Sequence, residues 1–163
     1  MKRRDFAINS VAAASLASLP LASLAQKRKD AVVMGMTLEP TGGMDPTATA
    51  ASATAEIVHY NIFETLTKIN SDGTVSPLLA ESWEISPDLK TYTFKLRKGV
   101  KFQNGEPFNA STVKFAFERA AGEKSTNKDK RTFAAMERVG VVDEHTVVVI
   151  NKELNPDFLF LMG

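Results

Sequence analysis

The chain has 163 residues, with 20 Lys and Arg against 19 Asp and Glu, which gives a formal net charge of +1. Proteins that hold nucleic acid through phosphate contacts usually carry a clear basic excess, so this balance argues against nucleic-acid binding. The chain contains no cysteine, which excludes disulfides, thiolate metal sites and a cysteine nucleophile.

The N-terminus is typical of an export signal. Basic residues 2–4 precede an uncharged stretch, Ala7–Leu24, that is rich in Ala and Ser. A transmembrane helix needs about 20 strongly apolar residues, and this stretch is too short and too weakly apolar. The small residues Ser23 and Ala25 suit signal peptidase. We therefore expect residues 1–25 to be a signal peptide that is cleaved after Ala25.

Arg3 and Arg4, followed two residues later by Phe6, resemble the twin-arginine export signal. Lys2 stands where Ser or Thr is usual and Ala7 where Leu is usual, so a general secretory signal is the alternative. Without residues 1–25, the remaining chain has 17 basic and 18 acidic side chains. We expect this mature chain in the periplasm or outside the cell.

The first part of the mature chain predicts a strand, a long loop and a helix. Val32–Met36 is a short apolar run that indicates a buried strand. Residues 39–53 are rich in Pro, Gly, Thr and Ala, and loops of this length are often functional. Thr54 can cap a helix that runs to about Lys68, because apolar residues recur at helical spacing. These residues are Val58, Ile62, Leu66 and Ile69.

The middle of the chain predicts strands followed by a capped helix. Residues 78–85 are apolar and partly extended, and residues 86–88 form a turn. Thr91–Arg97 alternates cleanly, as in a half-buried strand. After a turn at residues 104–105, Asn109 caps a helix over Ala110–Ala121. The strand's core face is formed by Tyr92, Phe94 and Leu96.

The last part predicts a polar connector over residues 122–130 and a hairpin of Val139–Val142 with Thr146–Ile150. Residues 155–156 then open an apolar segment, which we expect to begin a helix near Pro156. The sequence stops within this segment. We therefore interpret residues 26–163 as the N-terminal part of a longer protein.

Three sequence blocks resemble the signature region of the family 5 extracellular solute-binding proteins. They are Leu79–Trp83, Tyr92–Phe102 and Asn104–Ala110. Residues 44–46 and the hairpin at 139–150 also match the family's pattern, whereas Thr112 stands where the family usually has Asp. An acidic residue there would favour the helix dipole, so Thr112 places the strength of this helix in slight doubt.

Members of this family are the peptide, dipeptide and nickel receptors of ABC importers. The resemblance implies an α/β fold of the periplasmic-binding-protein type II kind, in which two lobes close on the ligand. Residues 26–163 would form part of the first lobe, and most ligand-contacting positions would lie beyond Gly163.

The loop at residues 39–53 is our candidate for ligand binding, because ligands lie at the carboxyl ends of strands in open α/β sheets. Thr41 can present a hydroxyl group and Met44 an adaptable apolar side chain. We predict that Glu39, Thr41 and Met44 contact ligand. The alternative is an ordinary surface turn in which Asp45 caps the segment after Pro46.

Other residue patterns favour structural roles. Glu56 and His59 have the spacing of a metal-binding pair, but a site of that kind needs a second copy. Trp83 suits core packing better than stacking on a ligand, and we expect His145 to be solvated in a hairpin turn. A basic cluster forms a solvated strand face or, alternatively, a surface that docks the permease. Its members are Lys95, Arg97, Lys98 and Lys101.

The resemblance implies a periplasmic substrate-binding protein that delivers a peptide or similar small solute to a membrane permease. We expect a monomer without enzymatic activity, cofactor, metal or nucleic-acid partner. One alternative is an exported enzyme whose catalytic residues lie beyond residue 163. Another is an inert short chain whose exposed sheet edges would make it aggregate.

Overall fold

The computed structural model describes residues 35, 36, 38, 39 and 43–163. The chain divides into two units, Met1–Gly35 and Met36–Gly163, and the second holds nearly all of the described residues. The expected signal peptide lies outside the described residues, as do residues 32–34 of the expected first strand. Within the described residues, no helix has both the length and the apolar character needed to cross a membrane.

The first helix, α2 (Ser52–Val58), is shorter than the sequence predicts. The expected extension to Lys68 is wrong, because His59 is extended and Tyr60 has a left-handed φ of 62°. An aromatic residue seldom adopts that φ, and the helix cannot continue through it. Ile62, expected on the buried stripe, is 47% exposed.

A hairpin replaces the second half of the expected helix. Strands β1 (Thr67–Ile69) and β2 (Val75–Pro77) pair antiparallel. In their turn, the Asp72 carboxylate accepts hydrogen bonds from the Thr74 N–H (2.9 Å) and hydroxyl (2.7 Å). Gly73 adopts a φ of 81°, which glycine tolerates without a steric penalty.

A four-stranded antiparallel sheet with strand order β3-β4-β6-β5 forms the centre of the fold. Its strands are β3 (Ala80–Ile85), β4 (Thr91–Leu96), β5 (Met136–Asp143) and β6 (Thr146–Asn151). Both described sheets are antiparallel, so they contain no parallel strand ends of the kind that we expected to position the ligand.

The alternating pattern of β4 is confirmed. Tyr92, Phe94 and Leu96 are each at most 2% exposed, and they face the same side of the sheet as Val147 and Val149 of β6. The predicted hairpin of the last two strands is also confirmed, although β5 begins at Met136 rather than Val139.

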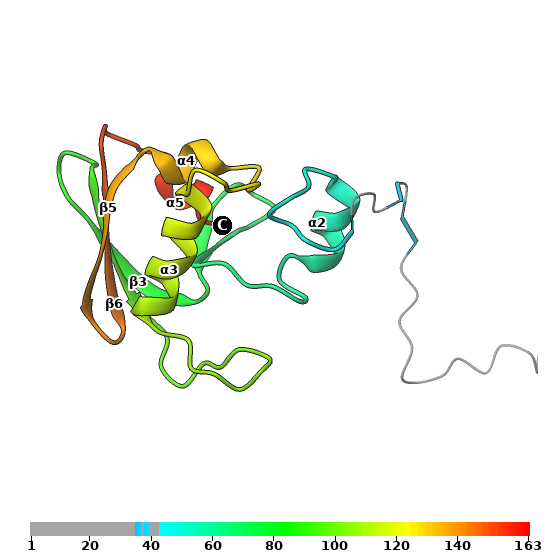
Figure 1. Cartoon of the computed structure of the whole chain (residues 1–163), viewed down its shortest axis with the longest axis horizontal. Helices are drawn as coiled ribbons and strands as arrows, with labels where there is room; N and C mark the ends of the chain where they lie inside the picture. Colours follow the sequence, from blue (N-terminus) through cyan, green and yellow to red (C-terminus); the bar gives the residue numbers. More distant parts are fainter. Residues whose placement is uncertain (1–34, 37, 40–42) are drawn as a thin grey trace, which may run out of the picture. The chain divides into compact units, whose positions relative to one another are not determined.

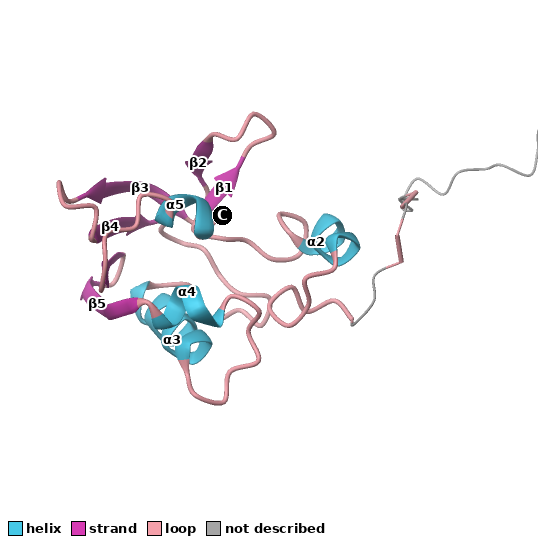
Figure 2. Cartoon of the chain, turned by 90° about the horizontal axis from the view of Figure 1, so that it is seen from above, coloured by secondary structure: helices cyan, strands magenta, loops and turns pink. Residues whose placement is uncertain are grey.

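Three helices lie on one face of this sheet (Figure 1), and Figure 2 shows the same arrangement from above. They are α3 (Ala110–Ala121), α4 (Lys130–Ala134) and α5 (Phe158–Leu161). Phe158 of α5 is fully buried, and its ring centroid lies 4.6 Å from that of Tyr92. Helix α4 was not predicted, because the polar sequence Lys130–Ala134 has no apolar periodicity.

The predicted helix α3 begins and ends as expected, and Thr112 has a part in its start. The Asn109 carboxamide oxygen accepts from the Thr112 N–H (3.1 Å), and the Thr112 hydroxyl accepts from the Asn109 N–H (3.1 Å). This reciprocal pair is a capping box. Thr112 therefore contributes to the helix start through hydrogen bonds, in place of the charge of an Asp.

Candidate functional site

The predicted ligand-binding loop is exposed where the structure describes it. Glu39 is exposed, Met44 is 43% exposed, and Thr41 lies outside the described residues. The Thr54 hydroxyl donates a hydrogen bond to the Gly43 carbonyl oxygen (3.2 Å), which ties the end of this loop to α2. Neither Glu39 nor Met44 lines either of the two cavities described below.

The residues that follow Met44 form a compact turn around Asp45. The Asp45 carboxylate accepts hydrogen bonds from the Thr47 N–H (2.8 Å) and the Thr47 hydroxyl (2.7 Å). These bonds favour the ionised carboxylate and lower the pKa of Asp45, and the more distant Arg119 adds a smaller effect. Asp45 is therefore negatively charged at neutral pH.

This turn borders an apolar cavity of about 380 Å³. The Lys128 N–H donates to the Thr47 carbonyl oxygen (2.7 Å), which joins the turn to the connector before α4. The walls come from the α2–β1 connection, the 102–108 loop, α3, α4 and the end of α5. The apolar wall residues include Phe63, Leu66, Leu79, Phe102, Phe108, Val113, Phe117, Phe133, Leu161 and Met162.

Several walls of this cavity retain exposed apolar surface. Phe63, Phe102 and Leu161 are 46%, 42% and 47% exposed. The rings of Phe102 and Phe108 meet edge to face, with centroids 6.2 Å apart. A cavity of this size with an aromatic wall is typical of a small-molecule site.

Five ionisable side chains line the same cavity, and two of them pair with each other. Lys128 Nζ lies 3.0 Å from the Asp129 carboxylate. Partial burial and the positive charge of Lys128 lower the pKa of His59, so its ring is neutral at neutral pH. The carboxylates of Asp45 and Glu64 remain, and neither forms an ion pair within the described residues.

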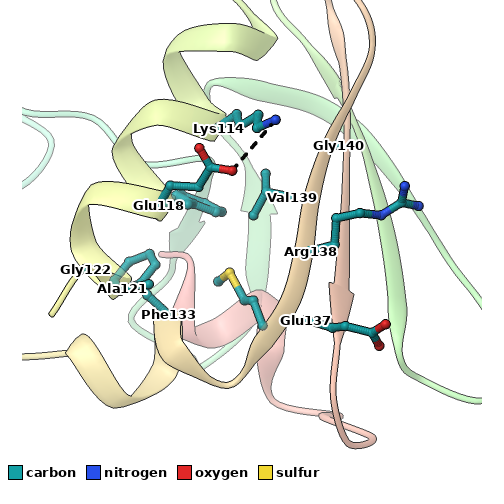
Figure 3. A pocket seen from close by; sticks show the side chains of 11 residues that line it. Lys114, Glu118, Ala121, Gly122, Phe133, Glu137, Arg138, Val139 and Gly140 are labelled. Carbon is teal, nitrogen blue, oxygen red and sulfur yellow. Dashed lines mark ion pairs between the residues drawn. The ribbon is translucent and has the colours of Figure 1, made fainter.

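A second groove, of about 440 Å³, lies between α3, α4 and β5 (Figure 3). Its floor includes the edge-to-face pair Phe117 and Phe133, with ring centroids 5.2 Å apart. At its rim, Lys114 Nζ lies 3.7 Å from a Glu118 carboxylate oxygen. This exposed pair contributes little to stability, and no predicted site residue lies in the groove.

Glu56 and His59 do not form the helical pair that their spacing suggests, because α2 ends at Val58 and His59 is extended. His59 instead lines the apolar cavity. The described residues contain no group of three or more His, Cys, Asp or Glu side chains that could hold a metal. The geometry thus gives no support to a metal site at this position.

Two further residues that the sequence singled out, Trp83 and His145, lie outside the apolar cavity and the second groove. Trp83 is partly buried and packs against the hydrophobic core, as expected. His145 is partly exposed in its turn, so the expected solvation holds for only part of its side chain: its Nδ1 atom is buried and has no hydrogen-bond partner within the described residues. The burial follows from the position of His145 beside β4, where its carbonyl oxygen accepts from the Leu96 N–H (2.7 Å).

The basic cluster is exposed, as predicted for a solvated face. Lys95 Nζ donates to the Thr146 hydroxyl (3.1 Å), and the Arg97 guanidinium donates to the Leu78 carbonyl oxygen. Two members are thus held by neighbouring strands and loops. Docking of a permease by this cluster stays a prediction.

Sequence reasoning missed the apolar cavity, although it singled out the loop beside it. The wall residues come from positions between 45 and 163, and only the tertiary fold brings them together. The sequence alone does not distinguish these apolar wall residues from ordinary core residues. The turn-rich segment around Asp45 was the only local signal.

Residues 74–163, more than half of the chain, match the family described as bacterial extracellular solute-binding proteins, family 5 Middle. The di/tripeptide-binding protein 1 of Pseudomonas aeruginosa is 36% identical over 135 residues, which are 72% of this chain and 25% of that protein. The glutathione-binding protein GsiB of Salmonella choleraesuis is 34% identical over 154 residues, 94% of this chain and 29% of that protein. The chain thus spans less than a third of the length of these curated relatives.

Two solved structures show the same fold. OppA of Haemophilus influenzae, in complex with the peptide RPPGFSPFR, matches with a TM-score of 0.65 and 29% identity over 73% of this chain and 26% of that chain. NikZ of Campylobacter jejuni, in complex with Ni(L-His), matches with a TM-score of 0.59 and 29% identity over 62% of this chain and 20% of that chain. These matches confirm the expected fold class. The assignment of residues 26–163 to the first of two lobes stays a prediction.

Proposed function

This chain belongs to the family 5 bacterial extracellular solute-binding proteins, and on that premise we propose that it is part of the receptor of an ABC importer for peptides. The observation that carries the proposal is the family match over residues 74–163, together with relatives named for di- and tripeptides and for glutathione. Glutathione is itself a small peptide, so these relatives share one ligand chemistry. Nickel complexes form a second candidate class, favoured by the likeness to NikZ.

The proposed mechanism is capture of the peptide between two lobes and its delivery to the permease. In the whole protein, a second lobe closes on the peptide by hinge motion, and the closed form delivers it to the permease. The described residues supply an apolar cavity, hydrogen-bonding loops and carboxylates. They would act by binding alone, so we propose a receptor without enzymatic activity.

The exposed loop before Asp45 is where we place the first ligand contacts. Glu39 would hold a cationic group of the peptide, Thr41 would offer a hydroxyl group, and Met44 would cover an apolar side chain. The exposure of Glu39 and Met44 supports this role, because both side chains are free to meet a ligand. We further propose that residues 1–25 direct export, that the mature protein is periplasmic and that it acts as a monomer.

Solute retention tests this function. The chain is mixed with equal concentrations of di- to pentapeptides, glutathione and nickel–histidine, then passed through an ultrafiltration membrane, and the retained solutes are identified by mass spectrometry. We expect the peptides to be retained above the level of a protein-free control. Retention of nickel–histidine alone would favour the second class, and retention of no solute would contradict the proposed function.

A further inference from the structure

We propose that Asn104 is a site of spontaneous covalent modification, at which the side-chain amide is lost as ammonia and the residue becomes aspartate or isoaspartate. Asn104 lies in the turn before α3, and Gly105 follows it in the only Asn-Gly pair of the chain. The reaction needs only this turn and water, so it is independent of the proposed function.

The reaction depends on a main-chain nitrogen that can reach the side-chain carbon. The Gly105 nitrogen attacks Cγ of Asn104, the Cγ–Nδ2 bond breaks, and the leaving ammonia carries away the proton of the Gly105 N–H. The product is a succinimide ring. Water then adds to either ring carbonyl, a C–N bond of the ring breaks, and the nitrogen takes up a proton from the water. The residue is left as aspartate or isoaspartate, without any oxidant, reductant or cofactor.

The hairpin loop at residues 103–105 presents both groups to water. The Phe102 N–H donates to the Glu106 carbonyl oxygen (2.8 Å), and the Gly105 N–H donates to the Phe102 carbonyl oxygen (2.9 Å). Gly105 adopts a left-handed φ of 88°, which is the conformation that glycine favours at the end of such a loop. All residues from 101 to 107 are exposed, so water reaches the whole turn.

The side chain of Asn104 is held beside the peptide that must attack it. Its Oδ1 atom accepts a hydrogen bond from the Glu106 N–H (3.1 Å), which fixes the side-chain carbonyl near the Gly105 peptide and withdraws electron density from Cγ. Apart from the neighbouring residues, no atom lies within 4 Å of where a Cβ of residue 105 would be, so the nitrogen is not shielded. The Gly105 N–H must first release the Phe102 carbonyl oxygen, and local opening of an exposed loop costs little free energy.

Asn127 has the same side-chain hydrogen bond but no glycine after it. Its Oδ1 atom accepts from the Asp129 N–H (2.8 Å). The next residue is Lys128, whose side chain crowds the nitrogen and whose N–H donates to the Thr47 carbonyl oxygen (2.7 Å). We therefore expect Asn127 to react more slowly than Asn104.

Asp72 shows how the aspartate product would fit. In the loop between β1 and β2, Asp72 accepts from the Thr74 N–H (2.9 Å), and Gly73 follows with a φ of 81°. The Gly73 N–H donates to the Asn70 carbonyl oxygen (2.9 Å), as in the other loop. Conversion of Asn104 to aspartate should therefore keep its turn and add a negative charge. Isoaspartate lengthens the main chain and should break the hydrogen bonds of the turn.

Incubation of the folded chain at mildly alkaline pH, followed by a brief trypsin digestion and tandem mass spectrometry, tests the proposal. The tryptic peptide 102–114 holds both Asn104 and Asn109, and its fragment ions tell the two apart. Asn109 is the internal control, because its side chain caps α3. We expect Asn104 to convert several-fold faster than Asn109 and Asn127, and enzymatic methylation to detect isoaspartate in this peptide.

Two variants test the roles of Asn104 and of the turn. Asn104→Gln moves the amide carbon one bond further from the Gly105 nitrogen, so the conversion in peptide 102–114 should be lost. Asp72→Asn places an amide before Gly73 in the matching loop, and we expect a new conversion at position 72 at a rate close to that at Asn104. Circular dichroism checks that both variants keep the fold.

Two results would overturn the proposal. One is conversion at Asn104 that is no faster than at Asn109 and Asn127. The other is a folded chain in which Asn104 stays intact while the urea-unfolded chain converts, since the turn would then protect the residue. In the Asp72→Asn variant, an unchanged position 72 would contradict the role given to the turn.

Discussion

Asn151, at the end of β6, carries a buried side-chain amide that has no hydrogen-bond partner in the described part of the chain. The residue is 3% exposed, and neither amide atom of its side chain has a hydrogen bond within the described residues. Its neighbour across the ladder is Met136, whose side chain offers no strong donor or acceptor. Leaving a buried polar group unpaired costs about 1–3 kcal/mol. Asn is therefore less favourable at this position than an apolar residue of similar shape would be.

We predict that Asn151→Leu raises the free energy of unfolding by about 1 kcal/mol, since Leu has the same branched shape and number of side-chain heavy atoms and no unpaired polar atoms. Urea denaturation followed by Trp83 fluorescence measures the change. Asn109→Leu is the control, because the same substitution there removes a helix cap and should lower stability. A loss of stability in Asn151→Leu would show that this amide has a partner.

His59 makes stability depend on pH. Its pKa is lowered by partial burial and by Lys128, so the unfolded chain binds the proton more readily than the folded chain does. The contribution is present above the ordinary histidine pKa and is lost as the pH falls through the lowered value.

We therefore expect the urea midpoint to fall between pH 7.5 and pH 5, and His59→Gln to reduce that fall. His145→Gln serves as the comparison at the other histidine. An identical pH dependence in the His59→Gln variant would contradict this role of His59.

At the scale of elements, α3 shows how a local signal can decide both ends of a helix. Asn109 and Thr112 exchange hydrogen bonds at the start, and Arg119 lies in the last turn, where a positive charge favours the helix dipole. The apolar positions Val113 and Ala120 then face the sheet.

The two residues of the capping box should contribute unequally to the free energy of unfolding. We predict that Asn109→Ala lowers the free energy of unfolding by about 1 kcal/mol, because a side-chain cap is lost. Thr112→Val, which keeps the shape and removes only the hydroxyl group, should lower it by less, since the Asn109 cap remains. The two urea denaturation curves measure the difference, and a larger effect of Thr112→Val would contradict this ranking.

Sequence patterns predicted elements well where the signal is local. β4 alternates, the last two strands flank a two-residue turn, and α3 has its cap, so each is set by its neighbours in the chain. The helix after Thr54 was predicted too long because Val58, Ile62 and Leu66 keep a helical spacing. The left-handed Tyr60 and the hairpin of β1 with β2 override that spacing.

At the scale of the whole molecule, we expect the chain to begin with a signal peptide that is followed by part of a solute-binding protein. If residues 1–25 act as a twin-arginine signal, changing Arg3 and Arg4 together to Lys should abolish export, because that route needs the arginine pair. Changing Lys27 and Arg28 together to Gln, beyond the expected cleavage site, should leave export unchanged.

The measurement is the fraction of the chain in the periplasm, with N-terminal sequencing that should begin at Gln26. Export that survives the paired lysine change would point to the general secretory route. A mature chain that begins elsewhere would move the cleavage site.

The candidate site was only partly predictable, since the sequence indicated the loop near Met44 but not the cavity beyond it. Phe102 and Phe133 are far apart in the chain, and the packing of α3 and α4 on the sheet places both at one cavity. No local sequence pattern indicates that these two residues lie at the same cavity.

Native mass spectrometry of the chain after incubation with a peptide mixture tests the proposed binding of peptides most directly. We predict an additional species whose extra mass equals that of a bound peptide and which disappears when the protein is denatured. A spectrum that shows only the mass of the bare polypeptide, at peptide concentrations that saturate a related receptor, would contradict peptide binding.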